Sequence, residues 1–137
     1  MSLEPCGWCY NSQFLTETYG NSINDFEIYL GDPTNFPKID DPKKFVAGMI
    51  LPHLKEIRLR KDLQGIYDYV PVDKVYKINN KEVLVKGRIP IHLPEKVVAH
   101  EFEHWLDLDE TSEEEIDRRA LEKYKDYYVK KSLSYIV

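Results

Sequence analysis

The sequence has no long apolar run and no block of basic residues. A membrane-spanning helix needs about 20 apolar residues, so we expect none in this chain. The N-terminus also lacks the basic and hydrophobic regions of a signal peptide, which predicts a cytoplasmic protein. The net charge is −5 at pH 7 and the basic residues are scattered among acidic ones. This pattern predicts no nucleic-acid partner and no membrane partner. Because 137 residues suffice for one hydrophobic core, residues 1–137 are predicted to form a single domain.

Cysteine is scarce: the chain has two, Cys6 and Cys9, separated by two residues. One such pair supplies only two thiolates, too few to complete a structural zinc site by itself. The remaining interpretations are two small residues in an aromatic-rich turn, a disulfide, a redox dithiol, and a zinc site shared with His53, His92 or a second chain. We predict an irregular cysteine-containing segment over residues 1–20.

Histidine is also scarce, yet two of the four histidines form the pattern His-Glu-any-any-His, as His100 and His104. Residues four apart lie above one another on a helix, so both imidazoles can bind one metal ion. Zinc suits this donor set, as do several other first-row metals, and it lowers the pKa of a water molecule that it binds to about 7. Glu101 is then placed to act as the general base. The alternative is a surface helix whose histidines only form hydrogen bonds or face solvent.

The residues around this motif predict a helix with a separate apolar face. Pro94 suits a first helical turn, and the acidic Glu95 suits the positive end of the helix dipole. Val98, Phe102 and Trp105 recur at helical spacing. The two histidines are therefore not needed to fill the core and are available for a site.

A third metal ligand should be a carboxylate after the motif, because no histidine follows His104. Ile116, Ala120 and other apolar residues define the inner face of a second helix, and Glu113 and Asp117 lie at the edge of that face. Glu113 is the preferred ligand, and Asp117 can accept the second ring N–H of a ligating histidine. The remaining candidates are Glu114, Glu115, Asp107 and Asp109. Glu115 is also predicted to have a structural role, as part of a capping box with Ser112.

The rest of the chain predicts strands and one further helix. Strands are expected at residues 26–30, 54–63, 74–78, 82–85 and 88–93, a helix at 41–51, and a long C-terminal helix ending near residue 131. Asn79 and Asn80 suit the positive backbone angles of a hairpin turn. We expect an α+β domain in which a twisted, mainly antiparallel sheet of three to five strands packs against the motif helix and the C-terminal helix. Strand 88–93, with its internal proline, is predicted as an edge strand that could align an extended substrate.

The motif from His100 to His104, followed by Glu113 and Asp117, resembles the gluzincin metallopeptidases, in which ExxxD on the next helix completes HExxH. The closest resemblance is to compact ImmA/IrrE-like zincin domains, with Ile116 at a position that is usually alanine. It covers roughly residues 89–124. The resemblance implies a zincin-like fold with His100, His104 and Glu113 on one zinc ion per chain. It also implies that Glu101 is the general base in hydrolysis of a peptide or protein substrate.

Several functional questions stay open at the level of sequence. One alternative is a zincin-like domain that binds metal, or a partner protein, without catalysis. A weaker alternative is an oxidoreductase that uses Cys6 and Cys9. A phenol could stabilise the oxyanion of the transition state, with candidates Tyr67, Tyr69, Tyr124, Tyr127 and Tyr128. The sequence identifies neither the substrate nor the oligomeric state.

Overall fold

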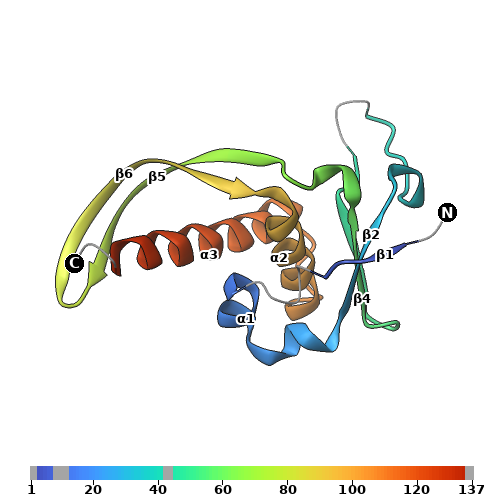
Figure 1. Ribbon diagram of the computed structural model, residues 1–137, viewed down its shortest axis with the longest axis horizontal. Coiled ribbons are helices and arrows are strands. Elements are labelled where there is room, and N and C mark those ends of the chain that lie inside the picture. Colours follow the sequence, from blue (N-terminus) through green and yellow to red (C-terminus); the bar gives the residue numbers. More distant parts are fainter. Residues whose placement is uncertain (1–2, 8–12, 42–44, 135–137) are drawn as a thin grey trace.

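The computed structural model describes residues 3–7, 13–41 and 45–134 of the chain (Figure 1). It has α+β architecture, as predicted. The strands are β1 (Glu4–Pro5), β2 (Glu27–Gly31), β3 (Gly48–Leu51), β4 (Glu56–Arg60), β5 (Tyr67–Ile78) and β6 (Lys81–His92). The α-helices are α1 (Gln13–Tyr19), α2 (Leu93–Leu106) and α3 (Glu113–Ser134), and short 3₁₀ turns are η2 (Gly20–Asp25), η3 (Pro33–Asn35) and η4 (Lys61–Leu63).

A four-stranded sheet forms one end of the molecule, with strand order β1-β2-β4-β3. Its two inner strands, β2 and β4, are parallel, and the outer strands pair antiparallel to them. Alternate residues of the inner strands are buried, among them Ile28 and Leu30 in β2 and Ile57 and Leu59 in β4. Period-2 alternation directs these side chains to one face, which packs on the core. The same order leaves β3 at the edge of the sheet, where it contacts α2.

Strands β5 and β6 form a separate antiparallel hairpin that extends away from the sheet beside α3 (Figure 1). Asn79 and Asn80 form its turn with φ angles of 52° and 65°, as their sequence predicts. Val72 and Tyr76 of β5 pack with Val129 of α3 in a small apolar cluster. The hairpin therefore continues directly into α2 while its outer half is anchored on the C-terminal helix.

The main core lies where α2 meets the other helices and the sheet. Val98 and Phe102 are fully buried on the inner face of α2, in agreement with the predicted apolar face. Phe102 stacks edge-on against Phe26, with ring centroids 5.7 Å apart. The Phe14 ring of α1 lies 4.9 Å from that of Tyr124 in α3. Aromatic contacts of this geometry add to the free energy of burial; they hold α2 against the residue that precedes β2, and α1 against α3.

A buried carboxylate also connects α2 to its neighbours. Glu103, inside the histidine motif, is only 3% exposed. It pairs with Lys123 of α3 and accepts a hydrogen bond from the Tyr19 hydroxyl at 3.4 Å. A buried charge is tolerated only when it is paired and hydrogen-bonded, so this position of the motif has a structural role.

Three local predictions are wrong. The first 20 residues are not irregular throughout, because β1 and α1 lie within them. The helix predicted at 41–51 is a strand over Gly48–Leu51, while residues 42–44 lie outside the described residues. The four apolar residues of that segment pair with β4, and so short an apolar run has no periodicity that distinguishes a strand from a helix. The predicted single sheet is two sheets, because β5 and β6 pair with each other and with no other described strand. The tyrosine-rich connection before residue 74 is the first part of β5.

Two further observations concern the N-terminus and membranes. Cys6 is fully buried and disulfide-bonded, which agrees with the disulfide interpretation; Cys9 lies outside the described residues. Within the described ranges, no helix has the length and apolar character needed to cross a membrane.

Candidate metal centre

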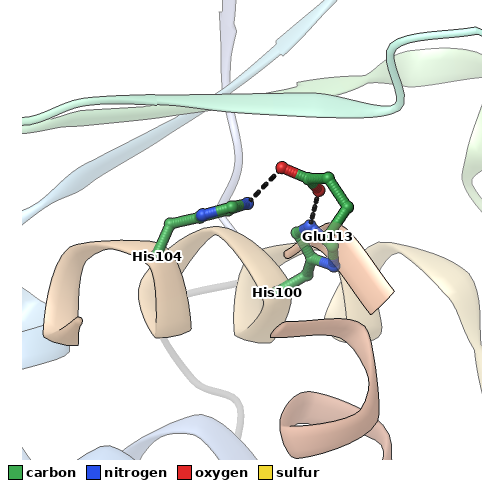
Figure 2. A group of neighbouring side chains, drawn as sticks. All are labelled: His100, His104 and Glu113. Carbon is green, nitrogen blue, oxygen red and sulfur yellow. Dashed lines mark hydrogen bonds and ion pairs between the residues drawn. The ribbon is translucent and has the colours of Figure 1, made fainter. Parts of the chain in front are cut away.

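Helices α2 and α3 bring His100, His104 and Glu113 together, and Figure 2 shows both imidazoles directed toward the Glu113 carboxylate. His100 Nε2 lies 2.8 Å from Glu113 Oε2, and His104 Nε2 lies 2.9 Å from Glu113 Oε1. The histidines are one helical turn apart on α2, and Glu113 is the first residue of α3. The six-residue connection between the helices places the three side chains around one point.

The donor set fits a small divalent ion. One ligand atom from each of the three residues lies within 4.8 Å of the other two. Tetrahedral zinc with bonds of about 2.1 Å holds its ligand atoms roughly 3.4 Å apart, so small side-chain movements suffice to bind it. Two neutral imidazoles and one carboxylate also leave a fourth coordination position for water or substrate. The arrangement can therefore hold a catalytic rather than a closed structural ion.

Asp117 and Lys96 extend the site behind His100. The Asp117 carboxylate lies 3.3 Å from His100 Nδ1 and 3.1 Å from Lys96 Nζ. Burial by itself lowers the pKa of His100, but the hydrogen bonds to Asp117 and Glu113 outweigh it and raise that pKa overall. The hydrogen bond to His100 lowers the pKa of Asp117, and Lys96 acts in the same direction. Asp117 thus orients His100 as an outer partner orients a metal ligand.

Glu101, the residue predicted to be the general base, lies beside this cluster. It is adjacent to His100 and lines the same groove as the two histidines. Burial raises the pKa of Glu101 to about 7. The charge of His100 opposes this rise, the charge of Glu113 adds to it, and a hydrogen bond with the Ile50 backbone opposes it. A carboxyl group with a pKa near neutrality can both accept and return a proton at physiological pH.

The other predicted ligand candidates lie elsewhere. Glu115 pairs with Arg118 at 2.6 Å and with Arg119 at 3.1 Å, and hydrogen bonds from these two arginines lower its pKa to about 2. Its backbone N–H donates to the Ser112 hydroxyl at 3.2 Å, which is one half of the predicted capping box. The other half is wrong, because the Ser112 N–H donates to the Glu110 carboxylate instead of that of Glu115. Asp107 pairs with Arg119. Glu114 and Asp109 are exposed and lie outside the cluster of metal donors among the described residues.

A groove of about 700 Å³ runs along α2 past the candidate metal centre. Its opposite wall is β3 and the segment that precedes it. Gly48 permits this close approach, because a Cβ atom there would lie 2.5 Å from Val97 Cγ1 of α2. The edge strand beside the motif helix is therefore β3. The predicted strand at 88–93 is the end of β6, and it is an edge strand as predicted, because β6 pairs only with β5 among the described strands. Of these residues only Leu93, the first residue of α2, lines the groove.

The tyrosines suggested as oxyanion donors do not reach the groove: no tyrosine lines its described part. The Tyr124 hydroxyl accepts from the His92 N–H, and the Tyr128 hydroxyl donates to Glu95. Lys96 does line the groove, and sequence reasoning missed it. Its position four residues before His100 places it on the same helical face, which was the available signal.

Comparisons of the chain with models of protein families, with curated proteins and with solved structures found no match in any of the three.

Proposed function

We propose that this protein is a zinc-dependent peptidase of the gluzincin type. The observation that carries the proposal is the convergence of His100, His104 and Glu113 from two helices, with Glu101 beside them in an open groove. The side chain of Glu113 is 71% exposed, and those of His100 and His104 are 18% and 24% exposed. An ion held there would be accessible to a substrate.

Glu101 performs the proton transfers in the proposed hydrolysis. Bound zinc supplies a Lewis acid that polarises the scissile carbonyl and acidifies a water molecule. Glu101 accepts a proton as that water attacks and returns it to the leaving amine. Asp117 keeps the Nδ1 proton of His100 in place, so that Nε2 faces the metal centre. Lys96, which lines the groove one helical turn before His100, is the proposed donor for developing negative charge.

The edge strand β3 supports a peptide as the substrate. The Arg60 N–H of β4 donates to the carbonyl of Ala47, the residue just before β3, at 3.0 Å. Hydrogen-bonding groups alternate between the two edges of a strand, so Gly48 and Ile50 direct theirs away from β4. The Ile50 backbone already forms a hydrogen bond with Glu101. The backbone groups of Gly48 are therefore the ones on this edge that we propose pair with an extended peptide. Such addition of a strand aligns a peptide backbone through main-chain hydrogen bonds.

Metal content is the first test. Elemental analysis of purified wild type should find about one zinc ion per chain, and His104→Ala and Glu113→Ala should each lose it. Glu114→Ala, which removes the neighbouring exposed carboxylate, is the matched control and should keep the metal. A wild-type protein that binds no zinc after zinc is supplied would refute the proposal. Zinc retained by Glu113→Ala would assign the third ligand elsewhere.

The second test separates catalysis from metal binding. Glu101→Gln should keep the metal but lose about 10²–10⁴-fold in the rate of peptide cleavage, because the general base is removed. Glu114→Gln should cleave at the wild-type rate. If Glu101→Gln cleaves as fast as wild type, Glu101 is not the base. Zinc-loaded wild type that cleaves no member of a broad peptide library would favour the non-catalytic alternative.

A further inference from the structure

The groove along α2 has two unlike halves. Its α2 wall carries Leu93 and Val97 in the first turns, and His100, Glu101 and His104 in the later turns. Eleven residues of helix separate Leu93 from His104, which corresponds to roughly 16 Å. The candidate metal centre thus occupies one half. Gly48 meets Val97, and Phe45 lies three residues before it; Leu63 and Leu93 both hydrogen-bond to the backbone of Ile66. The walls that face the other half are therefore apolar, and the lining residues Ile39, Phe45 and Leu63 belong to them.

Two large apolar side chains of this half are exposed although they stand in a concave surface. Phe45 is 52% exposed and Ile39 is 46% exposed. Phe45 stacks on the Arg60 guanidinium, with 4.3 Å between the guanidinium carbon and the ring centroid, which holds the ring in place. Exposed apolar side chains gathered in a groove mark a binding site.

The charged residues of the groove do not favour a charged substrate side chain in its apolar half. Lys96 is the one cation among the described lining residues, and Asp117 holds it at 3.1 Å. An acidic side chain of a substrate would have to share this lysine with Asp117, whose negative charge repels it. The apolar walls, in contrast, carry no polar partner that must be replaced.

The register of β3 determines which side chain of a bound peptide would enter this apolar half. Residues opposite one another in an antiparallel pair direct their side chains to the same face. At Gly48 the face toward α2 is occupied by Val97, whose Cγ1 would lie 2.5 Å from an added Cβ. A peptide residue paired with Gly48 therefore directs its side chain toward α2, beside Val97. Gly48 lies only two residues before Ile50, the backbone partner of Glu101.

We propose that the apolar half of the groove selects peptides with a bulky apolar side chain, such as leucine or phenylalanine, within two residues of the cleaved bond. This inference rests on the proposed peptidase function. The side chain would lie against Val97 and Leu93 and be covered by Phe45 and Ile39. Burying one leucine or phenylalanine corresponds to about a tenfold or greater gain in affinity over alanine.

Binding can be measured without turnover in zinc-loaded Glu101→Gln. Calorimetric titration with extended peptides that differ at one position should give a dissociation constant at least about tenfold lower for leucine or phenylalanine than for alanine or aspartate. Phe45→Ala, made in the same background, should reduce this preference several-fold. Leu84→Ala is the matched control, because Leu84 is 57% exposed on the hairpin outside the groove.

The outcomes for selectivity and for catalysis are distinguishable. Cleavage by wild type at many sequences with no apolar preference would overturn the selectivity and leave the peptidase proposal standing. An apolar preference that Phe45→Ala does not alter would also overturn it, since another surface would then bind the side chain. A preference that Phe45→Ala abolishes and Leu84→Ala preserves would establish the apolar half as the specificity site.

Discussion

At the scale of single residues, His100 is distinguished by carboxylates on both ring nitrogens. Glu113 lies on the Nε2 side and Asp117 on the Nδ1 side. The two acids have different roles in the proposed site: Glu113 shares the ion, and Asp117 fixes the tautomer and orientation of the ring. Outer partners of this kind tune metal affinity without touching the metal.

The role of Asp117 predicts a loss of affinity rather than loss of the site. Asp117→Asn keeps the shape of the side chain but removes its charge, so we expect zinc affinity to fall about 10–100-fold. Competition with a chromophoric chelator measures this change. Glu114→Gln, an exposed carboxylate on the same helix, should bind zinc as wild type does. Equal affinity in wild type and Asp117→Asn would show that Asp117 does not support the ligand.

At the scale of elements, the close approach of β3 to α2 builds the site. The two elements meet at Gly48 and Val97, and Glu101 bonds the backbone of Ile50 on the same strand. Glu101, the proposed general base, is therefore held by an edge strand as well as by its own helix. A change in the spacing between these elements should lower the free energy of unfolding and also change the shape of the groove.

Gly48→Ala tests this packing. The added Cβ would meet Val97 Cγ1 at 2.5 Å and the Arg58 carbonyl at 3.0 Å, and overpacking of this kind costs about 1–3 kcal/mol of unfolding free energy. Urea unfolding measures the loss. Gly7→Ala, where an added Cβ meets nothing within 4 Å, should change stability by less than about 0.5 kcal/mol.

A double variant tests whether Val97 is the side chain that an added methyl group at Gly48 would meet. Val97→Ala removes the atom that the new methyl group would meet, so the double variant should be less destabilised than the sum of the two single variants. Strict additivity of the two free-energy changes would show that Val97 does not limit the position of β3.

At the scale of the whole molecule, buried phenols tie α3 to the rest of the chain. Tyr76 of β5 donates to Asp126 at 2.9 Å, and burial, with help from this carboxylate, raises the pKa of Tyr76 to about 12. Burial likewise raises the pKa of Tyr124 to about 12. These groups stay protonated in the folded protein at a pH where an unfolded chain begins to lose phenolic protons.

Alkaline pH should therefore destabilise the fold. Between pH 10.0, the ordinary pKa of a phenol, and about 12, the unfolded state binds fewer protons than the folded state. The unfolding free energy should fall as pH rises through this range, by on the order of 1 kcal/mol or more for each such tyrosine. Urea unfolding at several pH values measures the slope. Tyr76→Phe should flatten it, whereas Tyr69→Phe, at a 60% exposed residue, should not; equal slopes in all three proteins would contradict this account.

Much of the arrangement around the site followed from local patterns. The first turn of α2, its apolar face and the Asn79–Asn80 turn agree with prediction, as does the bond from the Glu115 N–H to the Ser112 hydroxyl. Each depends on residues within one or two turns of each other, where periodicity and capping chemistry act. The strand β3 was mistaken for a helix because four apolar residues have no distinctive period.

The sequence by itself determined that His100 and His104 share a helical face, that Glu101 lies beside them, and that Glu113 and Asp117 share a face of the next helix. These are consequences of helical geometry, which needs no other part of the chain. Only the tertiary structure decided that Glu113 meets both imidazoles, that β3 forms the opposite wall, and that no tyrosine reaches the described part of the groove. Those relations join residues distant in the chain, and the packing of α2 against α3 and the sheet sets them.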